Sequence, residues 1–147
     1  MQSTAEDTQA LAQQLLGVVH ALMRGGSRQV FALMEELDLS FTGFKALHTL
    51  LEADDELSVK QVAERLGMSL PGASRAVESL LQIGMLERRE DPIDRRIKRV
   101  RVTDHGRDVA HRIEVARLAG AERYLAALSP EQRDRLSAAL ADLPVHP

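Results

Sequence analysis

The sequence predicts a mainly α-helical protein that carries one small antiparallel β hairpin. Two observations support this fold class. Apolar residues recur at helical spacing over most of the chain, and several of these stretches follow a capping residue. A clear alternation of apolar and charged residues is confined to residues 97–103. A length of 147 residues allows one compact domain with a core and is too short for two ordinary ones.

The composition is that of a globular protein, with 44% apolar and 28% charged residues. Cysteine is absent, which excludes disulfides, thiolate metal sites and cysteine-based redox sensing, and is typical of a protein from a reducing cytoplasm. The N-terminal residues lack the basic and apolar pattern of a signal peptide, and no run approaches about 18 apolar residues. We therefore expect a cytoplasmic protein with no membrane segment.

The N-terminal third predicts helices with an interruption. Ser3 and Glu6 form a capping box ahead of an apolar series that extends to Leu22. Residues 24–27 (Arg-Gly-Gly-Ser) are expected to break or kink this helix, and a second apolar series continues beyond them. Ser40 is the expected N-cap of the next helix.

The middle of the chain predicts a helix-turn-helix. Ser58 and Gln61 form a capping box for a helix that stops at Gly67, a residue type favoured where the backbone turns left-handed. After a tight turn, Ser69 caps a second helix, which ends at Gly84. Two helices joined by so short a turn have the spacing of a helix-turn-helix motif.

The next segment predicts a β hairpin, or wing. Residues 85–89 and 97–103 are expected to be antiparallel strands, joined by the polar, proline-containing loop 90–96. Residues 103–104 then cap a long helix, and Ser129 starts the last one. Together these elements predict a winged helix-turn-helix lobe flanked by helices from both termini.

Charge is distributed unevenly along the chain. Residues 57–103 contain ten cations and six anions, a net charge of +4, whereas the remainder contains nine cations and sixteen anions, a net charge of −7. Such a split can steer a protein onto a polyanion in one orientation. Charge blocks of this size also arise by chance on solvated surfaces, so the split alone does not identify a partner.

Within the run from Leu57 to Arg112, four segments in this order and spacing resemble the DNA-binding lobe of the MarR family of bacterial regulators (multiple antibiotic resistance regulators). They are AERLGMS at the turn, SRAVESLLQIGMLERR through the second helix and first strand, DPIDRR at the wing, and VTDHGR leading into the long helix. Each segment is weak evidence singly, whereas the four together are specific.

The resemblance implies a single MarR-like domain over residues 1–147. Its winged helix-turn-helix lobe would span 38–103, and its helical dimerisation lobe would combine 1–37 with 104–147. It implies a homodimer that binds an inverted-repeat operator in double-stranded DNA. Many members of the family release DNA when a small aromatic or phenolic effector binds between the two lobes. We therefore expect a DNA-binding transcription regulator, most simply a repressor.

Candidate DNA contacts lie at the start of the two motif helices. The first turns of the recognition helix should approach base edges, where Arg75 can fork onto guanine or onto phosphate. Residues that open the preceding helix are better placed for phosphate oxygens. The candidates are Ser69, Pro71, Gly72, Ser74 and Arg75 for the recognition helix, and Lys60 and Gln61 for the preceding one.

At the wing, Arg95 and Arg96 are expected at the hairpin tip, where a guanidinium can enter a narrow minor groove. The family pattern of Asp, any residue, Arg falls on Asp94 and Arg96. Since Asp94 cannot face phosphate favourably, we expect it to orient one of the arginines. The sequence leaves open which arginine enters the groove.

Five histidines lack the spacing of a metal site, so we expect no metal, and no other cofactor is indicated. His20 and His48 are candidate polar contacts in an effector pocket, although ordinary half-buried histidines would explain them as well. No catalytic constellation is present, which argues against an enzyme. The alternative function is a winged-helix protein-interaction module that never touches DNA, which would have no need of the cationic wing tip.

Overall fold

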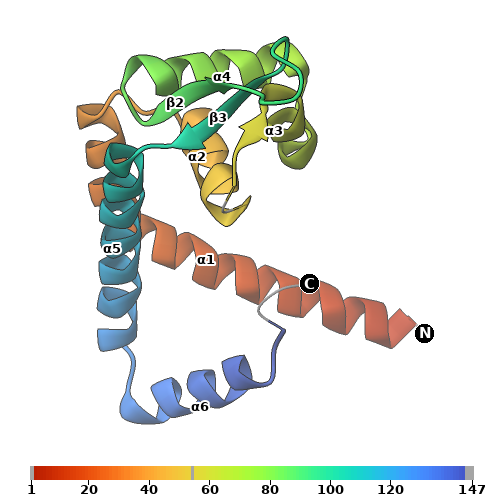
Figure 1. The fold of residues 1–147 in the computed structure, drawn as a ribbon. Helices are drawn as coiled ribbons and strands as arrows, with labels where there is room; N and C mark the ends of the chain where they lie inside the picture. Colours follow the sequence, from red (N-terminus) through yellow and green to blue (C-terminus); the bar gives the residue numbers. More distant parts are fainter. Residues whose placement is uncertain (1, 54, 145–147) are drawn as a thin grey trace. The chain divides into compact units, whose positions relative to one another are not determined.

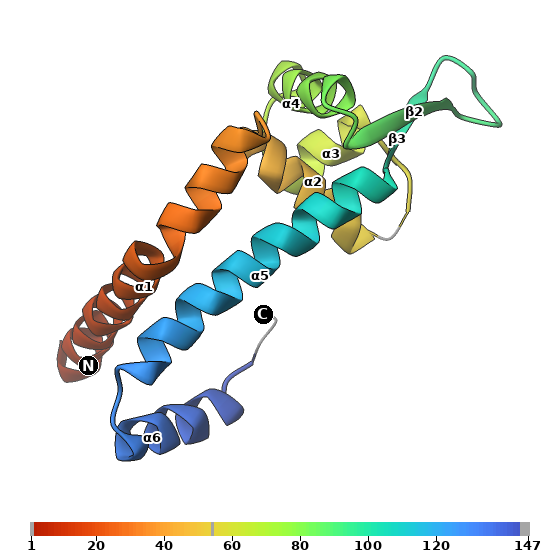
Figure 2. The same ribbon diagram turned by 90° about the vertical axis from the view of Figure 1, so that its left-hand side faces the viewer.

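The computed structural model describes residues 2–53 and 55–144, with the backbone alone for residues 2–6 and 25–27. The described part is mainly helical and has one small sheet (Figures 1 and 2). Its elements are α1 (Gln2–Glu36), α2 (Phe41–Ala53), β1 (Leu57–Ser58), α3 (Val59–Leu66), α4 (Leu70–Gln82), β2 (Leu86–Glu90), β3 (Lys98–Val102), α5 (Asp104–Ala126) and α6 (Pro130–Ala141). The predicted fold class, mainly α with a small antiparallel wing, is confirmed.

The chain divides into two compact units. Unit 1 combines Met1–Gln29 with Ala116–Pro147, and unit 2 is the continuous stretch Val30–Val115. Helices α1 and α5 therefore each contribute to both units. Unit 2 contains the whole helix-turn-helix, the sheet and the wing.

We expected either a break or a kink at residues 24–27, and the break is wrong, because the helical backbone of α1 runs through them. Two adjacent glycines cost a helix roughly 1 kcal/mol each relative to alanine, but they keep their backbone N–H groups. The segment contains no proline, the residue type that removes a hydrogen bond and obstructs the preceding turn. Helix propagation from both sides therefore carries the backbone across the glycines.

Local caps define the helices of unit 2 as the sequence predicted. Ser40 Oγ accepts the backbone N–H of Gly43 at 3.0 Å at the start of α2. Ser58 and Gln61 form a reciprocal capping box at α3, and Ser69 caps α4. Gly67, with φ +61°, ends α3 in the left-handed conformation that glycine adopts without strain. The turn between α3 and α4 is therefore specified by residues within the turn itself.

The wing belongs to a three-stranded antiparallel sheet with the order β1-β3-β2. Leu86 lies opposite Val102 and Leu57 lies opposite Val100, so the apolar side chains of all three strands are buried. The sequence predicted the hairpin of β2 and β3. Leu57 pairs with a strand more than 40 residues further along the chain, and this pairing is a tertiary feature.

The core lies entirely in unit 2, where the sheet, the helix-turn-helix helices and the adjoining ends of α1 and α5 pack together. Its largest fully buried side chains are Leu47, Leu50, Leu80, Met85, Ile113, Val62, Val77, Val100 and Val109. Within the described residues, no buried hydrophobic side chain belongs to unit 1.

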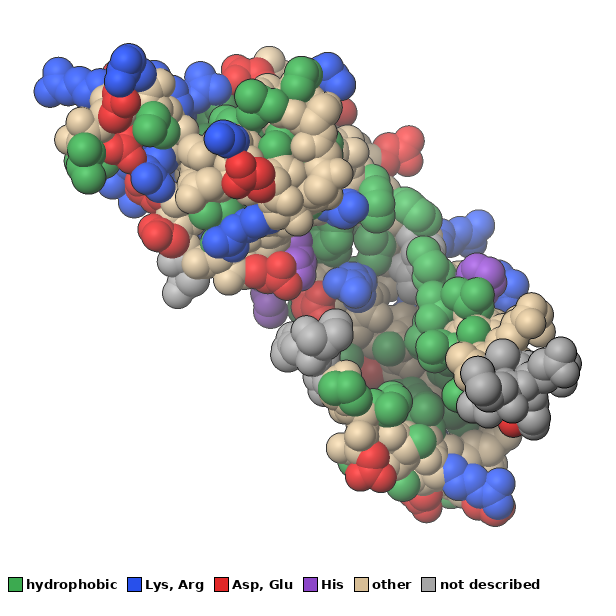
Figure 3. All heavy atoms as spheres, turned by 90° about the vertical axis from the view of Figure 1, so that its right-hand side faces the viewer, with side chains coloured by type: hydrophobic (Ala, Val, Ile, Leu, Met, Phe, Trp, Pro, Cys, Tyr) green, Lys and Arg blue, Asp and Glu red, His purple; other side chains and the backbone are tan. Residues whose placement is uncertain are grey.

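Unit 1 consists of the N-terminal part of α1, the C-terminal part of α5, and α6. Ser129 and Gln132 form a capping box at α6, which confirms the predicted start of the last helix. Hydrophobic side chains remain exposed on all three helices and gather on this part of the molecule in Figure 3. They include Leu11, Leu15, Leu16, Met23, Leu118 and Leu140. No helix in the described ranges is both long enough and apolar enough to cross a membrane.

Candidate nucleic-acid interface

Helix α4 presents Ser74 and Arg75 to solvent and an apolar face to the core. Ala73, Ala76, Val77 and Leu80 are buried, which leaves Ser74 and Arg75 exposed on the opposite face. Ser69 Oγ accepts the N–H of Gly72 at 3.2 Å, and Pro71 occupies the first turn. A cavity of about 250 Å³ adjoins this helix and is lined in part by Ser40, Gly72 and Arg75. Gly72 and Arg75 therefore line the same hollow on the surface of α4.

Two residues at the start of α3 were predicted to contact phosphate, and they differ in how far their side chains are engaged in other contacts. Lys60 is exposed and lies 3.9 Å from Glu64, a distance at which an exposed pair contributes little. The Oε1 atom of Gln61 accepts the N–H of Ser58 at 2.8 Å within the capping box. Gln61 therefore has its carbonyl engaged in the helix cap, and its amide nitrogen has no partner among the described residues.

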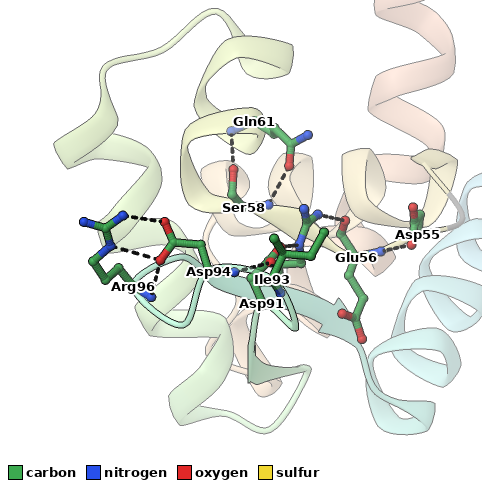
Figure 4. A network of polar contacts seen from close by, with 9 residues as sticks. Asp55, Glu56, Ser58, Gln61, Asp91, Ile93, Asp94 and Arg96 are labelled. Atoms are coloured by element: carbon green, nitrogen blue, oxygen red, sulfur yellow. Dashed lines mark hydrogen bonds and ion pairs between the residues drawn. The ribbon is translucent and has the colours of Figure 1, made fainter.

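Asp94 orients Arg96 at the wing. Its Oδ1 accepts both the backbone N–H and the Nε–H of Arg96 at 3.0 Å, and its Oδ2 accepts from Nη2 at 2.9 Å (Figure 4). The Arg96 side chain, followed by its backbone N–H, lowers the pKa of Asp94, and the carboxylate in turn raises the pKa of Arg96. The fork of Arg96 is thus held in one plane while the side chain remains 91% exposed.

The sequence analysis missed Asp91, which holds the wing together. Its carboxylate is 6% exposed, and Oδ1 accepts the N–H groups of Ile93 at 2.8 Å and Asp94 at 3.0 Å (Figure 4). Oδ2 accepts Nε–H of Arg99 at 2.5 Å, and Arg99 also donates to the carbonyl of Glu56 at 3.3 Å. An aspartate directly before a Pro-containing turn was the available signal, since Asp side chains commonly bond to backbone N–H groups two residues on.

Hydrogen bonds lower the pKa of Asp91 to about 2. The Asp94 N–H contributes most, followed by the Arg99 guanidinium and the Ile93 N–H. The same carboxylate raises the pKa of Arg99. Arg99 lies directly opposite Arg89 across the hairpin, a repulsive pairing of like charges. Asp91 compensates the charge of Arg99. Glu56, which lies 3.6 Å from Arg89, compensates the charge of Arg89.

The basic region is largely paired internally. Seven of the ten cations in residues 57–103 form ion pairs: Lys60–Glu64, Arg88–Glu78, Arg89–Glu56, Arg96–Asp94, Lys98–Glu90, Arg99–Asp91 and Arg101–Glu87. Arg65, Arg75 and Arg95 form no ion pair with any residue that the structure describes, and all three are exposed. Arg75 lies on α4 and Arg95 in the wing loop, so the two predicted DNA-contacting elements each carry one uncompensated guanidinium.

The two candidate effector-pocket histidines belong to different units. His20 is exposed on α1 in unit 1. His48 lies on α2 in unit 2, where its Nδ1 is 3.5 Å from Glu52 Oε1 and its ring meets that of Phe44 edge-on at 6.1 Å between centroids. The His48 side chain is 48% exposed, so it remains accessible to a ligand. In the described ranges, no three His, Asp or Glu side chains are grouped so that they could hold a metal ion.

These features define a class of protein. A helix-turn-helix followed by a β hairpin, with a free arginine on the second helix and another at the hairpin tip, is the arrangement of winged helix-turn-helix proteins. Residues 37–97 match the family model described as "MarR family". Over these residues the chain is similar to the MarR family.

Solved structures share this fold over most of the chain. A transcriptional regulator of the MarR family from Silicibacter pomeroyi is 26% identical, with a TM-score of 0.54, 88% of this chain covered and 89% of that one. YusO from Bacillus subtilis is 23% identical, with a TM-score of 0.71 and coverages of 92% and 98%. MepR from S. aureus, solved as a complex with DNA, is 20% identical, with a TM-score of 0.70 and coverages of 88% and 94%.

Proposed function

We propose that this chain is a transcription regulator that binds double-stranded DNA through α4 and the wing. One observation carries the proposal: most cations of the basic region are paired, whereas Arg75 on α4 and Arg95 in the wing loop are exposed and uncompensated. The two elements predicted to contact DNA thus each present a guanidinium that no described acidic side chain neutralises. The similarity of residues 37–97 to the MarR family, and the DNA complex of the similar MepR, support the same function.

In this proposal the two elements have different roles. Arg75 reads a guanine edge in the major groove, with Ser69, Pro71, Gly72 and Ser74 allowing close approach. Lys60 and Gln61 contact phosphate. The arginines of the wing approach the minor groove, where Asp94 sets the orientation of Arg96 and Arg95 carries the uncompensated charge.

Selection of bound fragments from a random duplex library tests the function directly. The purified protein should enrich an inverted repeat whose half-sites lie about 10 base pairs apart. Fluorescence anisotropy should then show steeply salt-dependent binding to that duplex. If no sequence is enriched and binding does not depend on salt, the winged helix is instead a protein-interaction module.

The inverted repeat follows from a proposed homodimer. The exposed apolar side chains of α1, α5 and α6 in unit 1 form no core within one chain, and burial against a second copy would remove them from water. Sedimentation equilibrium at micromolar concentration should give twice the monomer mass of 16.2 kDa. A folded monomer under these conditions would contradict the dimer.

We further propose that a small aromatic or phenolic effector releases the DNA, as in a repressor, and that the protein works in the cytoplasm. His48 is half exposed beside the Phe44 ring, so it offers a hydrogen-bonding group next to an aromatic edge. His20 is the second candidate contact. The probe is 4-hydroxybenzoate, titrated into the protein–DNA complex. Release that is weakened in His48→Ala and His20→Ala supports this site, and equal release in both variants places the effector elsewhere.

A further inference from the structure

The most exposed large apolar side chain in the described part of the chain lies at the wing tip. Ile93 is 95% exposed, whereas the next, Phe41, is 66% exposed. An isoleucine in this position makes no contribution to the core, and its apolar surface is fully hydrated. Its neighbours along the loop are Asp94 and the two arginines, so it lies within the cationic tip rather than on an apolar face.

The loop holds Ile93 in a defined position. The backbone N–H of Ile93 donates to the buried carboxylate of Asp91 at 2.8 Å (Figure 4), and Pro92 restricts the backbone immediately before it. Two further hydrogen bonds close the tip, from Asp91 N–H to the carbonyl of Ile97 at 3.0 Å and from Ile97 N–H to the carbonyl of Asp94 at 2.9 Å. Because isoleucine is β-branched, few rotamers are open to its side chain.

From these observations we propose that Ile93 is a DNA-contacting residue that places apolar surface in the minor groove beside the arginines. This inference rests on the proposed function, because it names a further contact of the same wing. The walls of the minor groove are formed by deoxyribose, and several minor-groove-binding proteins insert apolar side chains there. In one narrow groove, the fixed side chain of Ile93 would supply an apolar surface and the neighbouring free guanidinium would supply a positive charge.

The chemistry of the groove floor gives Ile93 a sequence preference. A·T and T·A pairs present only acceptor atoms in the minor groove, whereas G·C pairs add the guanine amino donor. Covering that donor with an apolar side chain leaves it without a hydrogen-bond partner, which is unfavourable. Ile93 therefore favours A·T pairs beneath the wing, at positions separate from those that α4 reads.

The test compares Ile93→Ser and Ile93→Val in salt titrations on the duplex recovered by the selection. Ile93→Ser should weaken binding by roughly three- to thirtyfold, and Ile93→Val should retain most of the affinity, because it keeps the branched apolar shape. The slope of log affinity against log salt should be the same in both variants, since an apolar contact releases no counterions. Circular dichroism melting should be unchanged, because the replaced side chain is solvated in the free protein.

A matched control is Ile97→Ser, which removes an isoleucine that is 42% exposed from the same wing. It should affect binding less than Ile93→Ser. Replacing A·T by G·C pairs beneath the wing should reduce the DNA affinity of the wild type by a larger factor than it reduces the affinity of the Ile93→Ser variant. Unchanged affinity in Ile93→Ser, an equal loss in Ile97→Ser, or an altered salt slope would each overturn the proposal. Wild-type protein that shows no salt-dependent binding to any duplex would instead refute the proposed function.

Discussion

Asp91 and Arg99 form an ion pair, with 2.5 Å between Oδ2 and Nε, that joins the start of the wing loop to strand β3. The second oxygen of the same carboxylate binds two backbone N–H groups of the loop. Arg99 continues the connection to the carbonyl of Glu56, ahead of β1. The tip that carries Ile93, Asp94 and both arginines is thus tied to the sheet through one buried carboxylate.

This carboxylate gives the protein a defined acid sensitivity. The folded-state pKa of Asp91, about 2, lies below its usual value of 3.8, so its stabilising contribution is complete above about pH 4 and is lost as the pH falls toward 2. Asp91→Asn should lower the melting temperature at neutral pH. The gap between the melting temperatures of wild type and variant should narrow below about pH 4. A gap that stays constant down to pH 2 would show that Asp91 does not act through its charge.

Gly106 cannot accept a side chain. A Cβ at this position would collide with the carbonyl oxygen of Met85, and Thr103 on the same turn donates to the carbonyl of Gly84 at 2.7 Å. We expect Gly106→Ala to destabilise the protein by roughly 1–3 kcal/mol in urea unfolding, because the start of α5 must move away from Met85, which lies between α4 and β2. Gly17→Ala is the control.

Gly17 lies within α1, and a Cβ there meets nothing within 4 Å. Gly17→Ala should therefore raise the free energy of unfolding by about 0.5–1 kcal/mol, since alanine loses less backbone entropy in a helix. Destabilisation by both substitutions, or by neither, would be inconsistent with a specific collision at Gly106.

Arg75 is expected to read sequence. Arg75→Ala should cost roughly 1–3 kcal/mol of specific binding and reduce the difference in affinity between the selected duplex and a random one. Arg65→Ala is a matched control, because Arg65 is an exposed arginine of α3 that also lacks an ion pair among the described residues. It should not alter sequence preference. If Arg75→Ala weakens binding to both duplexes equally, Arg75 contacts only phosphate.

The two wing arginines are expected to contribute most of the salt dependence. In a dimer, Arg95→Ala combined with Arg96→Ala removes four cations, which should flatten the slope of log affinity against log salt by roughly 3–4 units if all four neutralise phosphate. Arg95→Ala alone should flatten it by about 2 units. Sequence preference set by α4 should persist. An unchanged slope in the double variant would show that the wing does not contact the DNA.

Asp94→Ala isolates the orientation of Arg96 from its charge. The substitution removes the three hydrogen bonds between these residues and retains both arginines. Affinity should fall by less than in the double arginine variant, because the guanidinium is loosened rather than removed. A gain in affinity would mean that Asp94 acts mainly by repelling phosphate and not by orienting Arg96.

The sequence by itself determined the starts of α2, α3, α4 and α6, the helix-turn-helix and the wing, whereas the side chains of Ser3 and Glu6, predicted to cap the first helix, lie outside the described residues. Ser40, Ser58, Ser69 and Ser129 each bond to a backbone N–H three residues ahead, so the residues that form these caps lie within one turn of each other in the sequence. The pairing of Asp94 with an arginine was predictable for the same reason, since Arg96 is only two residues away. Such contacts need no knowledge of the rest of the fold.

The tertiary structure decided the features that join distant residues. Strand register places Arg99 opposite Arg89 and beside Asp91, and it brings Leu57 to Val100. The same packing forces glycine at Gly106, 21 residues beyond Met85 in the sequence. The tertiary packing also determines which cations form ion pairs and which do not. Which arginine Asp94 holds, and which is left without an ion pair, depends on the geometry of the closed loop, because Arg95 and Arg96 both lie within two residues of Asp94 in the sequence.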